Sequence, residues 1–360
     1  MTTSGPNNPD GAFTGGQVTF GLDTFGDITV DRAGEPVPAS QVIRDVVEQG
    51  TLADRVGVDH FSVGEHHRDD FAVSAPDVVL AAIGARTTRI TLGSAVTVLS
   101  SDDPVRVYER FATLDAISDG RAEITVGRGS FIESFPLFGF DLDDYEVLFE
   151  EKLDLLTHLR TEQPLHWSGT TRAPLTGQRA HPTTVRGRIP VWVGVGGSPE
   201  SVMRAARHGL PLMLAIIGGA PVRFRPFVDL FHRATGDADL PVGIHSPGFV
   251  ADTDDEALDL LFPHFKANRD RIGRERGWPP VTRAEYEREA ADGALFVGSP
   301  ETVARRIADA VTALGVQRFD LKYANGTMPH EQLLHAVDLY GTQVVPRVRE
   351  LLTGRGTAVD

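Results

Sequence analysis

Eight apolar runs with strand character recur along the chain, and a segment with helical periodicity follows each run. The strand-like runs lie at residues 17–27, 58–63, 90–99, 122–126, 189–195, 210–217, 242–251 and 319–323. The run at 90–99 is largely apolar, as a strand buried on both faces of a parallel sheet should be. Eight alternating units predict an α/β fold, the (β/α)8 TIM barrel, with a doubly wound open sheet as the alternative.

Two stretches interrupt this alternation. Residues 161–188, which contain several prolines and glycines, and residues 278–292 fit neither a barrel strand nor its helix. We interpret them as insertions after strands 4 and 7, and composition does not show whether they act as lids. We expect a single domain over residues 17–352, a disordered polar tail at 1–16 and a C-terminal tail at 353–360.

Charge and composition limit the classes of function. Lys and Arg number 35 against 50 Asp and Glu, and the net charge of -15 argues against general binding to nucleic acid or anionic membranes. The absence of cysteine excludes disulfides, thiolate nucleophiles and zinc–thiolate sites. No apolar run approaches the ~20 residues that a membrane span requires, and the polar N-terminal stretch lacks the features of a secretory signal. A cytoplasmic location fits these observations.

The second strand-like run ends in Gly64, and the sequence Glu65-His66-His67-Arg68 follows directly. In a (β/α)8 barrel the active residues lie in loops after strands, and the near-neutral pKa of histidine suits proton transfer. This loop is therefore a candidate catalytic edge. The alternatives are hydrogen bonds that only stabilise the loop and, less favoured, a metal site, because adjacent histidines on an extended loop point apart. The same rule places further residues at this rim: Asp23, Ser100, Arg128, Ser130 and Gly196.

Two patterns indicate anion binding. Arg128 lies between two glycines, which let a ligand approach the backbone, and its guanidinium can bind phosphate or carboxylate with two hydrogen bonds. A solvated arginine in a tight turn is the alternative. Residues 196–201 place Ser and Pro at a helix start, where free N–H groups receive anions, although ordinary capping also explains them. Residues 298–302 repeat this pattern, and only the general barrel rule, which favours the second copy, separates the two.

Two further stretches are compatible with a ligand site. Small side chains at residues 94–97 leave room for a flat ligand, although composition favours a packed barrel layer there. Four phenylalanines follow the fourth strand-like run and either line an apolar pocket or anchor their loop to the barrel. They are Phe131, Phe135, Phe138 and Phe140.

At these residues the chain resembles the bacterial luciferase-like flavin-dependent monooxygenases. The resemblance runs from about residue 18 to residue 352. Its most specific parts are VGEHH at 63–67, GSAVTV at 93–98, DPVR at 103–106, VGRG at 126–129 and VGVGGSPES at 193–201. The resemblance implies a TIM barrel that binds FMN at the C-terminal rim. It also implies a homodimer formed through helices at 76–86 and 104–118.

The resemblance assigns roles near the flavin ring. His66 matches the histidine that luciferases use as a catalytic base, with Glu65 beside it as the second candidate catalytic residue and His67 as support. Ala95 and Val96 match a peptide bond that is cis beside the isoalloxazine ring.

The resemblance also assigns a phosphate site. Arg128 matches the arginine that contacts the FMN phosphate. Gly197, Ser198 and Ser201 match the phosphate loop, which selects the first of the two helix starts. Gly197 is a departure, because luciferase has an acidic residue there, and so a contact at this position would use the backbone. Gly127 stands where luciferase has a reactive cysteine, and nothing that depends on that thiol carries over.

The implied reaction is of the two-component type. A separate flavin reductase supplies reduced FMN, which reacts with O2 to give a flavin C4a-peroxide that oxygenates a small organic substrate. The sequence does not name this substrate. The alternatives are a deazaflavin-dependent dehydrogenase on the same barrel and a non-catalytic flavin-binding protein. No metal, nucleic-acid or membrane partner is expected.

Overall fold

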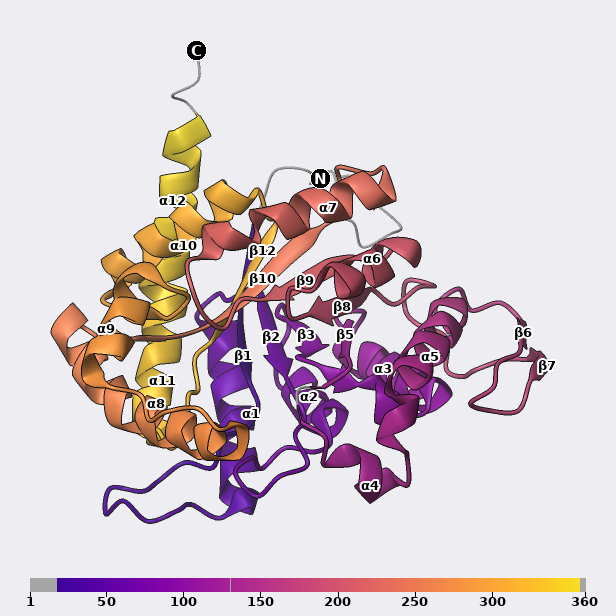
Figure 1. The fold of residues 1–360 in the computed structure, drawn as a ribbon, viewed down its shortest axis with the longest axis horizontal. Helices are drawn as coiled ribbons and strands as arrows, with labels where there is room; N and C mark the ends of the chain where they lie inside the picture. The colour runs from indigo at the N-terminus through magenta and orange to yellow at the C-terminus, as the bar shows by residue number, and fades with distance from the viewer. Residues whose placement is uncertain (1–17, 130, 357–360) are drawn as a thin grey trace.

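Eight parallel barrel strands form the centre of the molecule (Figure 1). The computed structural model describes residues 18–129 and 131–356. The barrel strands are β1 (Thr19–Thr24), β2 (His60–Val63), β3 (Thr91–Ser94) with β4 (Thr97–Val98), β5 (Ile124–Gly127), β8 (Val191–Val195), β9 (Leu212–Ala215), β10 (Val242–Val250) and β12 (Arg318–Lys322). The sheet runs from β3 through β2, β1, β12, β10, β9, β8 and β5 to β4.

The barrel closes because β3 and β4 are two parts of one strand. Two residues, Ala95 and Val96, separate them, and β4 pairs with β5. A parallel bridge between Leu92 of β3 and Ala122 joins the other part to the same neighbour. The predicted (β/α)8 barrel is therefore confirmed, and the doubly wound open sheet is wrong.

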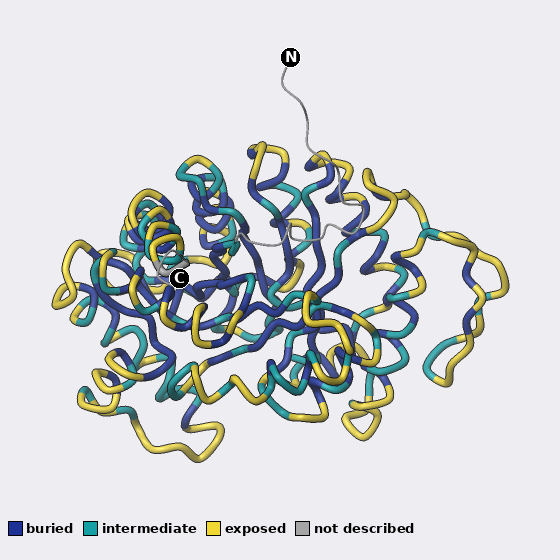
Figure 2. The backbone as a smooth tube through the Cα atoms, turned by 90° about the horizontal axis from the view of Figure 1, so that it is seen from above, coloured by how far each residue is buried: buried dark blue, intermediate teal, exposed yellow. Residues whose placement is uncertain are grey.

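Helices surround the barrel, and the strands lie buried between them (Figures 1 and 2). The barrel helices are α1 (Ala39–Arg55), α2 (Pro76–Gly84), α3 (Pro104–Ser118), α5 (Tyr145–Leu159), α6 (Pro199–Arg207), α7 (Arg225–Thr235), α8 (Asp254–Arg276), α10 (Pro300–Leu314) and α11 (His330–Leu339). After α11 the chain forms a π-helical turn (Tyr340–Val344) and then α12 (Val345–Gly356), which extends four residues into the stretch predicted as a tail. No described helix is long and apolar enough to cross a membrane.

Both interrupting stretches contain structure of their own. The first forms a hairpin of β6 (Leu165–Trp167) and β7 (Leu175–Gln178), which projects from the edge of the molecule in Figure 1. The second contains α9 (Arg283–Asp292), and β11 (Phe296–Gly298) then pairs with the outer end of β10. The loop after β5 holds the short helix α4 (Ser134–Phe138). The predicted N-terminal tail at 1–16 lies outside the described residues.

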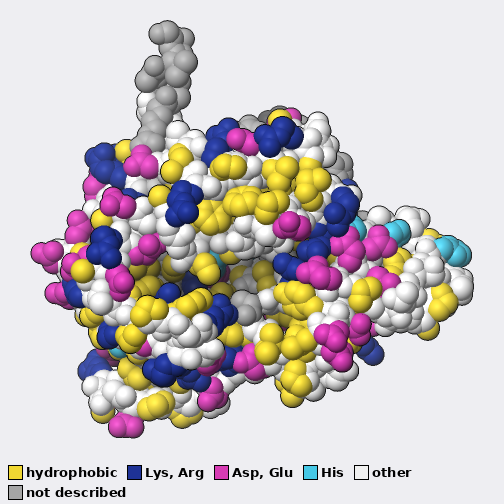
Figure 3. Space-filling view, viewed as in Figure 1, with side chains coloured by type: hydrophobic (Ala, Val, Ile, Leu, Met, Phe, Trp, Pro, Cys, Tyr) yellow, Lys and Arg dark blue, Asp and Glu magenta, His cyan; other side chains and the backbone are white. Residues whose placement is uncertain are grey.

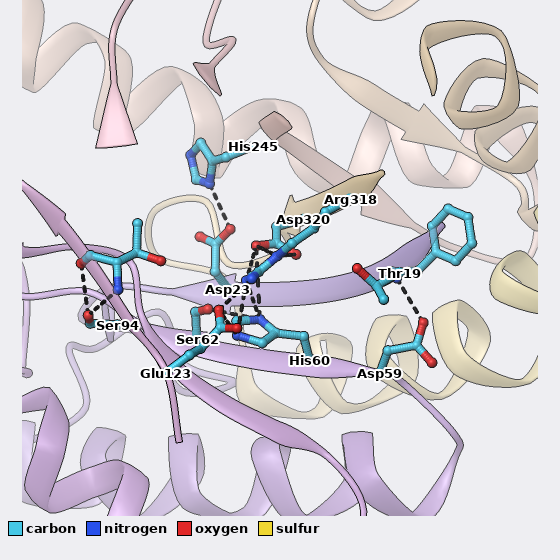
Figure 4. Close-up of polar contacts among 12 residues, drawn as sticks. Thr19, Asp23, Asp59, His60, Ser62, Ser94, Glu123, His245, Arg318 and Asp320 are labelled. Carbon is cyan, nitrogen blue, oxygen red and sulfur yellow. Dashed lines mark hydrogen bonds and ion pairs between the residues drawn. The ribbon is translucent and has the colours of Figure 1, made fainter. Parts of the chain in front are cut away.

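The barrel interior contains a compact group of charged side chains. Successive side chains of a strand point to opposite faces, so alternate residues of each strand point into the barrel. Arg318 is 1% exposed, and it donates from Nη2 to Asp320 over 2.7 Å and from Nη1 to Glu123. His60 Nε2 lies 2.8 Å from Glu123 Oε1 (Figure 4). Trp192 covers the guanidinium, with 5.1 Å from its carbon to the ring centroid. This cluster fills the barrel below the site described next.

We predict that Arg318→Met destabilises the protein strongly. The substitution leaves two buried carboxylates without their cation, and breaking a buried pair in this way costs about 3–5 kcal/mol. Arg347→Met is the matched control, because Arg347 binds Glu301 on the surface over 2.8 Å. Urea unfolding at neutral pH should show a large decrease in the free energy of unfolding for Arg318→Met and a small decrease for Arg347→Met. Equal decreases in the two variants would show that the interior ion pairs of Arg318 stabilise the protein no more than a surface pair does.

Candidate functional site

A cavity of about 550 Å³ opens at the C-terminal ends of the barrel strands. Figure 3 shows a hollow in this face, with hydrophobic side chains and Lys or Arg side chains at its margin. Strand ends and the loops after them supply its floor and two walls, while α8 supplies a third wall. Its lining includes Asp23, Phe25, Glu65, His66, Ala95, Val96, Arg128, Gly196, Ser201, His245, Arg269, Trp278 and Lys322.

His66 lies among three aromatic rings at the wall after β2. The centroids of Phe25, Phe71 and Phe131 are 4.6, 4.5 and 4.8 Å from that of the imidazole. Burial, reinforced by the positive charge of Lys322, lowers the pKa of His66 to about 3. The imidazole is therefore neutral at physiological pH and can accept a proton or a hydrogen bond from a bound molecule.

Glu65 connects the loop after β2 to the interrupted strand. Its Oε1 accepts a hydrogen bond from the backbone N–H of Val98 in β4. Burial raises the pKa of Glu65 to about 7, so this carboxyl changes charge near neutral pH. His67 supports it from outside the cavity, with Nε2 at 3.7 Å from Glu65 Oε2.

The break between β3 and β4 forms one flat wall of the cavity. The peptide bond between Ala95 and Val96 is cis, so the geometry expected from the resemblance is confirmed. Across this wall, a Cβ on Gly127 would lie 2.6 Å from the Val96 side chain, and one on Gly194 would lie 2.9 Å from it. These glycines leave the space that the Val96 side chain occupies. The position that carries a cysteine in luciferase has no room here for a larger residue.

The predicted phosphate site lies at the start of α6. Ser198 caps the helix by accepting a hydrogen bond from Ser201 N–H over 3.2 Å. Arg128 Nη2 donates to Ser201 Oγ over 3.1 Å, and Arg128 Nη1 also binds the carboxylate of Glu146. Glu146, whose side chain is 61% exposed, binds Arg204 as well. A surface carboxylate thus already occupies an anion position between two arginines. Gly197 has a φ of 88°, a backbone conformation that favours glycine.

At the second helix start, the carboxylate of Asp254 accepts the hydrogen bonds that an anion would otherwise accept. Asp254 Oδ1 accepts from Ser299 N–H over 2.6 Å at the start of α10, and Asp254 Oδ2 accepts from Thr302 Oγ1 over 2.9 Å. Neither Ser299 nor Thr302 lies on the cavity. This carboxylate takes the place that a phosphate would need, so the structure favours the first copy, which lies on the cavity, over the copy that the general barrel rule prefers.

The structure separates the residues that the barrel rule grouped at the rim. Asp23, Glu65, His66, Arg128 and Gly196 line the cavity. The side chain of His67 points elsewhere, and Ser100 is buried beneath the loop, where its carbonyl accepts from Lys152 over 2.6 Å. Ser130 lies outside the described residues.

The four phenylalanines and the two insertions differ in their relation to the cavity. Only Phe131 of the four lines it, whereas Phe135 is fully buried and Phe140 covers the Lys152 ammonium at 4.0 Å. These residues mainly anchor the loop. Trp278 is the one cavity-lining residue from the two interrupting stretches, within the part of the chain that is described.

Several cavity residues were not predicted. His245 of β10 and Lys322 of β12 lie at the floor, and Arg269 of α8 lies at the wall. Lys322 Nζ is 3.2 Å from Asp27 Oδ2. A lone histidine in an apolar strand and an arginine in a polar helix have no distinguishing pattern, and only the strand-end rule applied to β10 and β12 would have located the first two. No group of three described His, Asp or Glu residues is placed to hold a metal ion.

Comparison with known proteins shows which family the chain belongs to. Residues 24–318 match the luciferase-like monooxygenase family, and the chain belongs to it. It is 27% identical over 339 residues to 4-hydroxyprotoasukamycin monooxygenase of Streptomyces nodosus subsp. asukaensis, covering 88% of this chain and 90% of that protein.

Two solved structures share the fold. The oxygenating constituent of 3,6-diketocamphane monooxygenase from Pseudomonas putida, in complex with FMN, superimposes with a TM-score of 0.73 at 19% identity and covers 92% of this chain and 98% of its own. An F420-dependent secondary alcohol dehydrogenase superimposes with a TM-score of 0.72 at 16% identity, covering 92% and 99%.

We predict a pH-dependent stability difference between the wild type and Glu65→Gln. The folded protein keeps the Glu65 proton up to about pH 7, whereas the unfolded chain releases it near the ordinary value of 4.5. Wild-type stability therefore falls as pH rises through this window, by at most ~3 kcal/mol from this group. Glutamine keeps the acceptor for Val98 and does not ionise, so the variant should gain stability relative to wild type over the same window.

Urea unfolding of both proteins at about pH 5 and about pH 8 measures this difference. Glu200→Gln, at an exposed position of α6, is the control. If the free energy of unfolding changes with pH in the same way for wild type and Glu65→Gln, the Glu65 carboxyl is not held protonated by burial.

Proposed function

We propose that this protein is the oxygenase component of a two-component flavin-dependent monooxygenase, which uses reduced FMN from a separate reductase and O2 to oxygenate a small organic substrate. The observation that carries the proposal is one cavity that combines a wall at the cis peptide bond Ala95–Val96 with an anion site at Arg128 and Ser201. A planar ring joined to a phosphate has this shape and charge. The names of a monooxygenase relative and of an FMN complex on the same fold support it.

The residues of the cavity fit such a cofactor. Arg128, Ser201 Oγ and the free N–H groups at the start of α6 would hold the phosphate, which would displace Glu146 from Arg128. Gly127 and Gly194 let the Val96 side chain pack closely beside them, which would fix the Ala95–Val96 wall against which a ring would lie. When bound, reduced FMN supplies the activation of O2, which no side chain of this chain performs.

The chain's own residues would orient and protect the reacting groups. The aromatic rings around His66 exclude water, and His66 would accept a proton as a neutral base. Glu65 would hold the Ala95–Val96 wall in place through its bond to Val98.

The proposal includes a homodimer formed through α2 and α3, which pack against each other. Its support is the exposure of apolar side chains on both helices. Val78 of α2 is 65% exposed and Ile117 of α3 is 48% exposed. The flavin reductase would be a transient partner.

We expect Arg128→Ala to weaken FMN binding by roughly 10- to 100-fold, because a hydrogen bond to a charged group contributes about 1.5–3 kcal/mol. Ser201→Ala should weaken it less, by roughly fivefold. Thr302→Ala is the matched control, since Thr302 occupies the same position in the second helix start and binds Asp254. Fluorescence titration with oxidised FMN measures all three. Equal affinities of wild type and Arg128→Ala would remove Arg128 from the phosphate site.

A dehydrogenase that uses a deazaflavin is the second candidate, because a protein of the same fold is named as an F420-dependent alcohol dehydrogenase. Anaerobic titration with reduced FMN and with reduced deazaflavin, followed by admission of oxygen, distinguishes the two. We expect tighter binding of reduced FMN and, in air, a transient absorbance that belongs to neither reduced nor oxidised FMN. Preferential binding of deazaflavin would support the dehydrogenase. Binding of FMN without such a transient would support a non-catalytic flavin-binding protein.

A further inference from the structure

A histidine and an aspartate form a close pair at the floor of the cavity. His245 Nδ1 of β10 lies 2.7 Å from Asp23 Oδ2 of β1, and β12 runs between the two strands. Figure 4 shows the imidazole directed toward this carboxylate. Asp23 is fully buried, whereas the His245 side chain is 13% exposed and lines the cavity.

Asp23 depends on His245 for its counter-charge. Its other oxygen, Oδ1, is buried and has no hydrogen-bond partner among the described residues. The nearby cations are engaged elsewhere, because Lys322 binds Asp27 and Arg318 binds Asp320 with Nε and Nη2. A buried carboxylate without a cation is unfavourable, so the positive form of His245 stabilises Asp23.

The groups that face His245 come from three strands. Asp23 of β1 and Asp320 of β12 are negative, Lys322 of β12 is positive, and β9 presents the uncharged Met213 and Ala215. Burial alone would lower the pKa of His245, but the charge and hydrogen bond of Asp23, together with Asp320, outweigh it and raise that pKa. His245 is thus favoured as an imidazolium, in contrast to the neutral His66 on the same cavity.

The geometry leaves one nitrogen of His245 for a ligand. Nδ1 is held by Asp23, so Nε2 is the ring atom available to a molecule in the cavity. Phe25 stacks on the imidazole, with 6.3 Å between centroids and 26° between planes, and limits its rotation. Two imidazoles whose pKa values are shifted in opposite directions on one cavity are the arrangement that acid and base roles favour.

We propose that His245 is a second catalytic residue, which donates a hydrogen bond and then a proton from Nε2 to a substrate oxygen that gains negative charge, and that Asp23 is its positioning residue. This inference rests on the proposed function for its reaction. The substrate class that fits this role is a carbonyl compound, whose oxygen gains negative charge when a nucleophile adds to its carbon. The Nε2–H bond breaks and leaves its electron pair on the ring, and an O–H bond forms on the substrate. A proton from bulk solvent, relayed by water at the open mouth of the cavity, then restores the Nε2–H bond of His245.

The first test needs no flavin. In the full-length protein labelled with ¹⁵N-histidine, NMR titration should show His245 as an imidazolium at neutral pH. Asp23→Asn keeps the shape of the side chain and removes its charge, and it should convert His245 to the neutral form. Through-bond correlations to the protein backbone assign the His245 signal without relying on a substitution. A neutral His245 in the wild type, or an unchanged one in Asp23→Asn, would overturn the proposal.

The second test uses p-nitrophenolate as an oxyanion probe. Its addition to the labelled protein should shift the His245 Nε2 signal, and absorbance titration should show at least tenfold weaker binding by His245→Gln. His335→Gln is the matched control, because His335 forms a His–Asp pair with Asp252 at 3.2 Å on the surface. If the His245 Nε2 signal does not shift when p-nitrophenolate is added, the His245–Asp23 pair has only a structural role and the proposal is overturned. Failure of FMN binding would overturn the proposed function and leave both of these measurements interpretable.

Discussion

Compensation of buried charge is the constraint on which the interior of this barrel depends. Arg318, Glu123, His60 and Asp320 neutralise one another in the lower barrel, and Lys322 binds Asp27 nearer the cavity. Each cation is directed to a specific carboxylate, so the strands that carry them are held in register around the axis. Asp23 and Asp27 both have partner cations, His245 and Lys322, that line the cavity. The same electrostatic requirement that stabilises the barrel therefore places an imidazole paired with a buried carboxylate at the ligand site.

The secondary structure was predictable because its signals are local. Asp103 before Pro104 predicts the start of α3, and the structure shows Asp103 accepting hydrogen bonds from the N–H groups of Val105 and Arg106. The single strand expected at 90–99 was only partly right, because it breaks at the cis peptide bond of Ala95 into β3 and β4. No apolar pattern contains that break, and only the resemblance to a family indicated it.

The candidate site was predictable where a motif follows a strand and unpredictable where it depends on distant partners. Glu65, His66 and Arg128 lie in motifs, and all three reach the cavity. The two helix starts at Ser198 and Ser299 look alike in sequence, and what separates them is Asp254, 45 residues before Ser299. The role of His245 depends in the same way on Asp23, which is 222 residues away in the chain. Long-range pairs of this kind leave no trace in local spacing.

Glu146 has a consequence for the empty state of the anion site. Its carboxylate lies between Arg128 and Arg204 and stays largely in solvent, so the arginines keep a counter-ion when no phosphate is present. A tethered counter-ion of this kind lowers the free-energy difference between the empty and the loaded protein, because one anion replaces another. The site is then stable while empty, and under the proposed function a phosphate-bearing cofactor could enter and leave it without the barrel rim losing its order.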